Sequence, residues 1–286
     1  MVKLLDQDIL TREVLDWKGV HLLHFAGSSC SQKARVFLNL KQIEWESHPI
    51  DLGTNENYNP WYLGINPRGL VPTLVIDGEV HIESNDILTA LEHRFPTPEL
   101  IPANLASEVA FLLKHEDDLH LDLRTLTFRF MRPYLGPFRS TEALNSFRDG
   151  GSGTVEGQVD ANKKREIDFW ETNNAGISDE AVRKSAAAFR TAFDELEAKL
   201  AKSPYFLGNE ISVLDIAWYI YAVRLSTVGY PLQKLHPRVH GWFEGLNARD
   251  EFAKEVARPV GHADAIARFQ EELSREGKAL TDIAML

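Results

Sequence analysis

The hydrophobic pattern of this chain changes in kind near residue 104, and the change limits which folds are possible. Before it, short apolar runs alternate with one-faced helical patterns, whereas after it the strong patterns all have the helical period. The 286 residues are enough for two packed domains. We therefore predict an N-terminal extension over residues 1–19, an α/β domain over 20–100 and an all-helical domain over 104–286.

The first domain combines strands and helices in the order β-α-β, a polar connector, and β-β-α. The predicted elements are a strand over 20–25, a helix from about residue 30, strands over 43–50, 73–76 and 79–82, and a helix from the cap Ser84 to near Phe95. Asp77-Gly78 is a two-residue turn typical of β-hairpins. This order predicts a compact domain with a mixed four-stranded sheet.

The second domain begins with one long helix, predicted from Leu105 to about Met131. Residues 136–175 differ from their surroundings, because they are polar, weakly periodic and contain a Gly-Gly-Ser-Gly run; we interpret them as an insertion, partly helical and partly mobile. Ser178 is a predicted N-cap, and Ser212 with Asp215 forms a capping-box-like pair. The last 25 or so residues are charged and are expected to wrap the surface or fray.

Composition excludes several classes of function. The net charge of −11 argues against sequence-independent binding to nucleic acid or to an anionic membrane. No apolar run reaches the roughly 18 residues of a membrane-spanning helix, and the first residues lack the apolar segment of a secretory signal. Cys30 is the only cysteine, so we expect a reducing, cytoplasmic location. The ten histidines show no metal-ligand spacing, and we expect no metal site.

The segment Ser28-Ser29-Cys30-Ser31 lies where the first strand feeds the first helix. A thiolate there would gain from the helix dipole, from the free backbone N–H groups and from a hydroxyl donor such as Ser28 or Ser29. The chemistry leaves two thiolates open, that of Cys30 itself and that of a bound thiol cofactor. Taken alone, the segment is equally compatible with an ordinary serine-rich helix cap.

Two further motifs suggest a site for an extended peptide. Val71-Pro72 precedes an apolar strand, which is a setting for a cis peptide bond that presents the backbone of Val71 for pairing; the alternative is a trans proline opening an edge strand. Ser84 opens a helix and could hold a carboxylate, while Glu83 could pair with an amine. Together they suit a zwitterionic amino-acid end, although Ser84 could equally be a plain cap.

These motifs occur in the order and spacing of the glutathione transferase superfamily. The residues that carry the resemblance are Ser28-Ser29-Cys30-Ser31 with Arg35, Asn66-Pro67, Val71-Pro72 and Glu83-Ser84. The chain resembles the zeta class, the maleylacetoacetate isomerases, and the bacterial tetrachlorohydroquinone reductive dehalogenases, closely over residues 20–102 and more loosely over 178–252. The resemblance implies a thioredoxin-like N-terminal domain, a helical-bundle C-terminal domain, a homodimer and glutathione as cosubstrate.

The resemblance also implies roles for single residues. Ser28 would hydrogen-bond the glutathione sulfur with Cys30 beside it, Val71 would pair with the cysteinyl backbone, and Glu83 with Ser84 would hold the γ-glutamyl end. The polar stretch around Asn57 would meet the glycine carboxylate. The implied catalytic residues are Ser28, Ser29 and Cys30, and the implied glutathione-binding residues are Ser28, Cys30, Asn57, Leu70, Val71, Pro72, Glu83 and Ser84.

The chain departs from the zeta pattern in two respects. Gln32-Lys33 replaces an aromatic and a basic residue, and the insertion is longer than zeta enzymes carry, as in dehalogenase-like bacterial enzymes and ganglioside-induced differentiation-associated transferases. Both departures weigh against maleylacetoacetate as the substrate. Arg124, Phe128 and Arg132 could receive an anionic aromatic substrate. Alternatively, the arginines of this helix pair with Glu116, Asp117 or Asp118.

Three functions follow from these patterns. The first is a glutathione transferase that activates the thiol for attack on a small aromatic or unsaturated electrophile, in detoxification or aromatic catabolism. Conjugation, isomerisation, dehalogenation or ether cleavage would be the outcome. The second is a thiol transferase that depends on Cys30, and the third is a non-enzymatic binding protein with the same fold.

Overall fold

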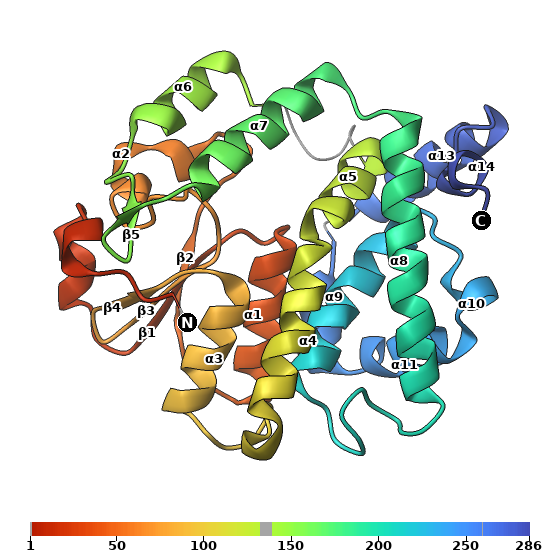
Figure 1. Cartoon of the computed structure of the whole chain (residues 1–286), viewed down its shortest axis with the longest axis horizontal. Helices are drawn as coiled ribbons and strands as arrows, with labels where there is room; N and C mark the ends of the chain where they lie inside the picture. The colour runs from red at the N-terminus through yellow and green to blue at the C-terminus, as the bar shows by residue number, and fades with distance from the viewer. Residues whose placement is uncertain (1, 132–138, 259) are drawn as a thin grey trace. The chain divides into compact units, whose positions relative to one another are not determined.

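The computed structural model of the chain describes residues 2–131, 139–258 and 260–286. The chain forms two compact units (Figure 1): residues 1–98 with 137–175, and residues 99–136 with 176–286. The insertion therefore groups with the N-terminal unit, although the sequence analysis assigned it to the helical domain.

The N-terminal unit contains the mixed four-stranded sheet that was predicted. The strands are β1 (Val20–His24), β2 (Glu46–Pro49), β3 (Thr73–Ile76) and β4 (Glu79–His81), in the order β2-β1-β3-β4. β2 runs parallel to β1, whereas β3 and β4 are antiparallel to their neighbours. Asp77 and Gly78 have φ values of 50° and 86°, which suits the tight turn of the β3–β4 hairpin. Helices α1 (Ser29–Leu40) and α3 (Ser84–Arg94) pack against each other, and α3 packs against β3 and β4.

The N-terminal extension is a packed part of this unit. It forms two 3₁₀ helices, η1 (Asp6–Asp8) and η2 (Arg12–Asp16). Leu4, Ile9 and Val14 are buried in one cluster with Leu23 of β1 and Val75 of β3. These three apolar anchors stand five residues apart, and their burial attaches the extension to the sheet.

The insertion folds into two helices joined by a short hairpin. These elements are α6 (Thr141–Asp149), β5 (Thr154–Val155), β6 (Gln158–Val159) and α7 (Asn162–Ala175). Phe147 and Ile167 are buried in one cluster with Tyr58 of η3 (Glu56–Tyr58) and Leu63 of α2 (Pro60–Leu63). The Asp8 carboxylate accepts hydrogen bonds from Thr154 Oγ1 at 2.6 Å and from the Gly157 N–H at 3.1 Å. The partly helical character that we predicted is present, whereas the hairpin was not foreseen.

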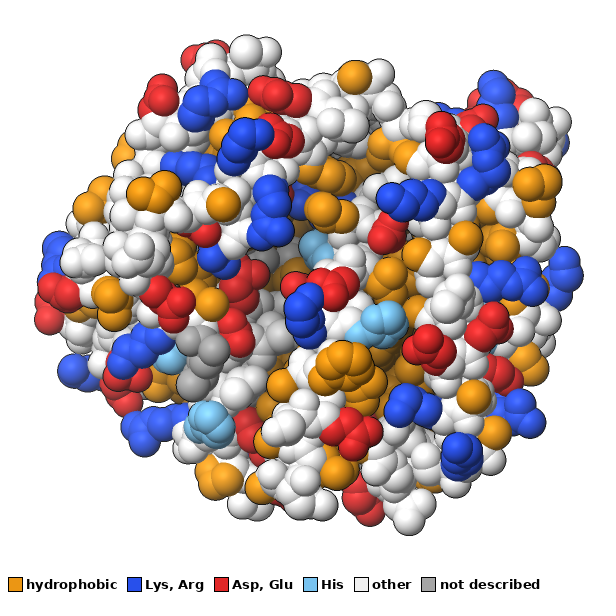
Figure 2. Space-filling model, viewed as in Figure 1, with side chains coloured by type: hydrophobic (Ala, Val, Ile, Leu, Met, Phe, Trp, Pro, Cys, Tyr) orange, Lys and Arg blue, Asp and Glu red, His pale blue; other side chains and the backbone are white. Residues whose placement is uncertain are grey.

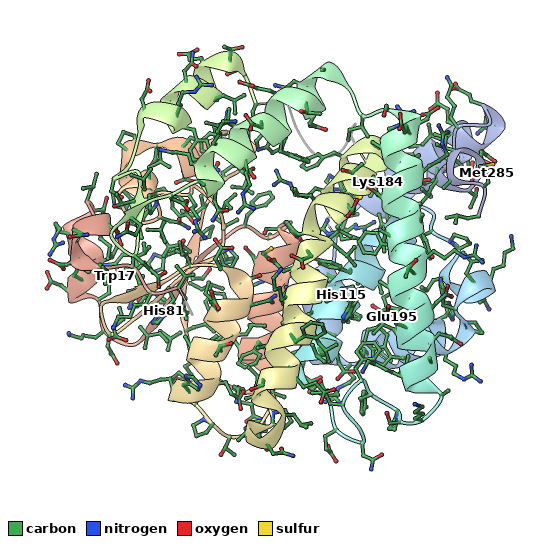
Figure 3. All side chains as sticks on the ribbon, viewed as in Figure 1. Trp17, His81, His115, Lys184, Glu195 and Met285 are labelled. Carbon is green, nitrogen blue, oxygen red and sulfur yellow. The ribbon has the colours of Figure 1, made fainter. Side chains whose placement is uncertain are left out.

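The second unit is helical throughout its described residues. It comprises η4 (Ala103–Leu105), α4 (Ala106–Asp118), α5 (His120–Met131), α8 (Asp179–Leu200), α9 (Val213–Thr227), α10 (Leu232–Leu235), α11 (Pro237–Asn247), α12 (Asp250–Val256), α13 (His262–Arg275) and α14 (Leu280–Ala284). The predominantly buried α9 packs against α4, α5 and α11. Between α4 and α8, His115 Nε2 lies 3.9 Å from Glu195 Oε2 (Figure 3).

One prediction for this unit is wrong, and another holds only in part. The long helix expected up to Met131 is divided at Leu119, because α4 ends on Asp117 and Asp118, and negative charge at a carboxyl terminus opposes the helix dipole. The final residues do not all fray or lie on the surface, since Leu280 and Ile283 are buried where α14 packs against α8. The predicted caps are correct: Ser178 Oγ accepts from the Ala181 N–H at 3.2 Å and begins α8.

Charge and hydropathy add two observations. On the face drawn in Figure 2, acidic and basic side chains are interspersed and no single sign dominates. Within the described residues, none of the helices combines the length and the apolar character needed to span a membrane.

Candidate functional site

Ser28 lies at the end of the loop that connects β1 to α1. It is the N-cap of α1, and its Oγ accepts a hydrogen bond from the Ser31 N–H at 3.3 Å. The same Oγ donates to the Val71 carbonyl at 3.5 Å, across 43 residues of sequence. Ser29 and Cys30 are the first two residues of the helix, and both side chains are half-buried. The structure thus brings Ser28 and Val71 together at the positive end of a helix dipole.

A buried arginine braces the turn between β1 and α1. Arg35 is 6% exposed, and its guanidinium donates to the carbonyls of Phe25 at 3.3 Å and Ala26 at 3.0 Å. Lys33, which replaces a residue of the zeta pattern, is also buried, and its Nζ donates to Asn85 Oδ1 of α3 at 2.9 Å. Arg35 therefore fixes the backbone that leads to Ser28, and Lys33 joins α1 to the first turn of α3 next to Ser84.

The loop before β3 is held by buried side chains from outside it. Asn57 Nδ2 donates to the Gly69 carbonyl at 2.7 Å, and Tyr62 Oη donates to the Leu70 carbonyl at 2.6 Å. Burial raises the pKa of Tyr62, so the phenol stays a neutral donor. The Val71-Pro72 peptide bond is cis, as predicted. The Val71 N–H has no hydrogen-bond partner within the described part of the chain.

Glu83 and Ser84 join β4 to α3. Glu83 has a φ of 67°, a strained value for a residue other than glycine, and it occupies the N-cap position without a side-chain cap. Ser84 is therefore the first helical residue and not the cap that we predicted, because the turn at Glu83 already begins the helix. Ser84 is 7% exposed, and its hydroxyl makes no hydrogen bond to any residue that the structure describes.

Arg68 connects this junction to the insertion. Its Nε and Nη2 donate to both oxygens of Asp160 at 2.8 and 2.9 Å, and its Nη1 donates to Glu83 Oε1. Burial alone would lower the pKa of Arg68, but the hydrogen bonds with Asp160 and the charge of Glu83 raise it. Sequence reasoning did not identify this group: Arg68 directly follows the Asn66-Pro67 motif but was given no role, and Asp160 carried no signal.

The residues proposed for a substrate pocket belong to the helical unit. Arg124 lies over the ring of Phe128, one turn further along α5, at 5.9 Å from the ring centroid. Arg129 pairs with Asp179 at 2.9 Å, so its partner is not one of the three acidic residues suggested for the arginines. Arg132 lies outside the described residues.

Comparison with known proteins places two family domains on the chain. The model of the glutathione S-transferase N-terminal domain matches residues 27–94, and that of the glutathione S-transferase C-terminal domain matches residues 179–245. The first match includes Ser28, Val71 and Ser84, and the insertion lies between the two matched regions.

Individual relatives agree with this assignment. The tetrachloro-p-hydroquinone reductive dehalogenase of Sphingobium chlorophenolicum is 24% identical over 244 residues, covering 84% of this chain and 95% of that protein. A zeta-class glutathione S-transferase of Euphorbia esula is 39% identical over 84 residues, which span only 29% of this chain and 37% of that protein.

Solved structures share the fold. The β-etherase LigF from Sphingobium sp. strain SYK-6 superposes with a TM-score of 0.69 at 23% identity, over 83% of this chain and 98% of that chain. The predicted thioredoxin-like N-terminal domain and helical C-terminal domain are thereby confirmed. The chain thus carries the N- and C-terminal domains of glutathione S-transferases, matched in order.

Proposed function

We propose that this chain binds glutathione in its N-terminal unit and activates the thiol for attack on a small aromatic or unsaturated electrophile. The observation that carries the proposal is the contact between the Ser28 hydroxyl and the Val71 carbonyl. It unites a helix amino terminus, a hydroxyl donor and an unpaired backbone N–H at one place. These are the groups that a peptide thiolate requires.

Ser28 is the proposed thiol activator. The hydrogen bond from its hydroxyl to the Val71 carbonyl is long, at 3.5 Å, and therefore weak. Rotation of the hydroxyl toward a bound sulfur would break only this weak bond. A hydrogen bond to the thiolate and the dipole of α1 both favour the charged form and lower the thiol pKa. The thiolate then bonds to carbon of the electrophile, and the displaced electron pair leaves with a leaving group or enters the unsaturated system.

The Glu83–Ser84 junction is the proposed site for the γ-glutamyl end. Arg68 carries one positive charge against the two negative charges of Glu83 and Asp160, so the group has an excess negative charge. An ammonium group beside Glu83 would neutralise that excess. The Ser84 hydroxyl and the amino terminus of α3 would bind the α-carboxylate.

Asn57 has a different proposed role from the one implied by resemblance. Its side chain is 2% exposed and donates to the Gly69 carbonyl. We assign it to positioning the loop that carries Leu70 and Val71. Arg124 and Phe128 remain the proposed contacts for an anionic aromatic substrate, and a homodimer and a cytoplasmic location also remain proposals.

Turnover of 1-chloro-2,4-dinitrobenzene with glutathione tests the proposal. A hydrogen bond to a charged group contributes about 1.5–3 kcal/mol, so Ser28→Ala should lower kcat/KM by about 10- to 150-fold. It should also raise the pKa of the bound thiol, read from thiolate absorbance against pH. Ser274→Ala, an exposed position on α13, is the matched control and should be neutral.

Cys30→Ser separates the alternative functions. If Cys30 forms mixed disulfides with glutathione, this variant loses disulfide reduction while Ser28→Ala retains it. The proposal instead expects conjugation to survive in Cys30→Ser. Calorimetry that detects no glutathione binding at millimolar concentration would reject both enzymatic functions and favour a non-enzymatic binding protein.

A further inference from the structure

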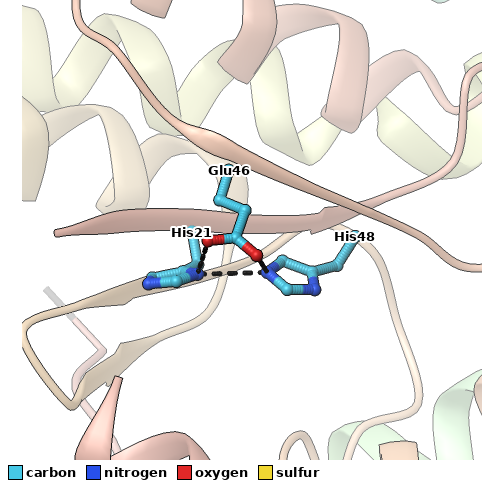
Figure 4. A group of neighbouring side chains, drawn as sticks. All are labelled: His21, Glu46 and His48. Atoms are coloured by element: carbon cyan, nitrogen blue, oxygen red, sulfur yellow. Dashed lines mark hydrogen bonds and ion pairs between the residues drawn. The ribbon is translucent and has the colours of Figure 1, made fainter. Parts of the chain in front are cut away.

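A group of two histidines and one glutamate lies on the β1–β2 edge of the sheet (Figure 4). His21 of β1 is the register partner of Glu46 in the parallel strand β2, and His48 follows two residues later. Because side chains alternate along a strand, Glu46 and His48 share one face, where His21 meets them. His21 Nδ1 lies 3.1 Å from His48 Nε2 and 3.5 Å from Glu46 Oε2, and His48 Nε2 lies 3.7 Å from Glu46 Oε1.

The hydrogen bonds of His21 determine which of its nitrogens is available. Its Nε2 lies 2.8 Å from the Lys18 carbonyl, which can only accept, so Nε2 must carry the proton. In the neutral imidazole, Nδ1 then carries a lone pair, which accepts a hydrogen bond from the Nε2–H of His48 at 3.1 Å; a metal ion would replace that proton, and His48 would then carry its proton on Nδ1. A histidine that ligates a metal typically anchors its other ring nitrogen to a carbonyl in this way.

We propose that His21 Nδ1, His48 Nε2 and the Glu46 carboxylate bind one divalent transition-metal ion, of which Zn²⁺ fits best. A tetrahedral ion with bonds of about 2.0–2.1 Å holds its ligand atoms about 3.3–3.4 Å apart. The Nδ1–Nε2 separation of 3.1 Å and the Nδ1–Oε2 separation of 3.5 Å lie around that value, and one ligand atom from each residue lies within 4.8 Å of the other two. Two imidazoles and one carboxylate favour zinc over Ca²⁺ or Mg²⁺, which prefer oxygen ligands alone.

The surroundings define an enclosed side and an open side. Trp17, which follows η2, stacks on the His48 ring at 4.5 Å between centroids and lies 4.7 Å from the His21 ring. The Glu46 side chain is 66% exposed, so the fourth coordination position faces solvent and would hold water. An ion here would join β1 to β2 next to Trp17 of the N-terminal extension. His21 is near the start of β1, whereas Ser28 follows the end of that strand. The site is therefore independent of the proposed thiol chemistry.

Sequence spacing predicted no metal site, because the two histidines are far apart in the chain and only strand register unites them. The test uses the full chain freed of metal with EDTA and measured without glutathione, which itself binds zinc. Calorimetry with Zn²⁺ and visible absorption with Co²⁺ should show one ion per chain. His48→Gln and Glu46→Gln should each weaken binding by about ten-fold or more. His93→Gln, an exposed histidine on α3, is the matched control and should bind as the original chain does.

Thermal unfolding supplies a second readout. Zn²⁺ should raise the Tm of the original chain and of His93→Gln, and should leave that of His48→Gln unchanged. If His48→Gln does not fold, Glu46→Gln decides the matter, because its exposed side chain tolerates the change. No binding at about 100 µM Zn²⁺, or equal affinity in Glu46→Gln and the original chain, overturns the proposal.

Discussion

At the scale of single residues, Ser84 stands out because its environment is enclosed while its hydroxyl lacks a hydrogen bond within the described residues. It is 7% exposed at the amino terminus of α3, beside the strained Glu83. A ligand carboxylate is the partner that this hydroxyl would bind under the proposed function.

Ser84→Ala should therefore weaken glutathione binding by about ten-fold or more, because a hydrogen bond to a charged group is lost. The free energy of unfolding without ligand should be unchanged or slightly higher, since the hydroxyl has no partner to lose. Calorimetry and urea unfolding measure the two quantities, with Ser274→Ala as control. An unchanged Kd would show that Ser84 does not contact the ligand.

His236 makes stability depend on pH in the helical unit. It is fully buried, with Nε2 2.9 Å from Tyr230 Oη and Nδ1 3.4 Å from Asp194 Oδ1. Burial lowers its pKa, and Asp194 and Glu197 only partly oppose this. The folded value thus lies below the unfolded value of about 6.5. As pH falls through 6.5, the unfolded chain gains the proton first, and stability is lost down to the folded pKa.

The urea midpoint should therefore fall between pH 7.5 and pH 5.5, and His236→Gln should reduce the size of that fall. The variant lowers stability at all pH values by removing packing, so the change with pH is the quantity to compare. His262→Gln, exposed on α13, should retain the original slope. An equal change of the urea midpoint with pH in His236→Gln and in the original chain would show that His236 does not cause the pH dependence.

Some site residues were predictable from sequence and others were not, for a physical reason. Ser28 and Val71-Pro72 are marked by local chemistry, namely a hydroxyl before a helix and a proline before a strand. The pair of Arg68 and Asp160 joins residues 92 positions apart, and no local pattern encodes that encounter. The proposed metal ligands could not be predicted from sequence either, because only the register of β1 and β2 brings them together.

At the scale of elements, the amino terminus of α9 depends on one buried carboxylate. Asp215 accepts from the Ser212 N–H at 2.9 Å, the Phe206 N–H at 3.2 Å and Trp242 Nε1 at 3.0 Å. It also accepts from the Ser212 hydroxyl at 2.7 Å. The capping-box pair predicted from sequence is confirmed, and it also fixes the preceding turn and α11.

Asp215→Ala should lower the free energy of unfolding by about 3 kcal/mol or more, because several buried donors lose their acceptor. Asp215→Asn should cost less, since one carbonyl oxygen remains. Urea denaturation measures both, and Asp264→Ala at an exposed position of α13 is the control. Equal losses in the alanine and asparagine variants would contradict the hydrogen-bond account.

Element boundaries followed from sequence wherever local signals mark them. The hairpin turn at Asp77-Gly78 and the caps Ser178 and Ser212 are such signals. The break at Leu119 was missed because the helical period continues through it, and only the acidic pair before it opposes the helix.

At the scale of the whole molecule, the first unit is assembled from two separate stretches of chain. The cluster of Tyr58, Leu63, Phe147 and Ile167 joins them. Neither stretch can bury this surface alone. The insertion thus completes the first unit, which its weak periodicity and Gly-rich sequence did not reveal. The apolar anchors of the extension were likewise hidden among polar residues.

A fragment of residues 1–98 should therefore expose Tyr58 and Leu63, bind a hydrophobic dye and aggregate. A peptide of residues 139–175 added in trans should reduce dye binding, because Phe147 and Ile167 cover the exposed surface. The same peptide with Phe147→Asp and Ile167→Asp is the matched control. A fragment that is soluble and dye-free by itself would show that the insertion is dispensable.

The discontinuity of the first unit also has a consequence for protein synthesis. A ribosome that has completed residue 98 must continue to residue 175 before the second stretch exists. At about 5–20 residues per second, this interval lasts about 4–15 s. During it, the emerging chain carries an uncovered apolar surface around Tyr58 and Leu63. Nascent chains of this protein should depend on chaperones in that window, and slowing translation between these residues should lower the yield of native protein.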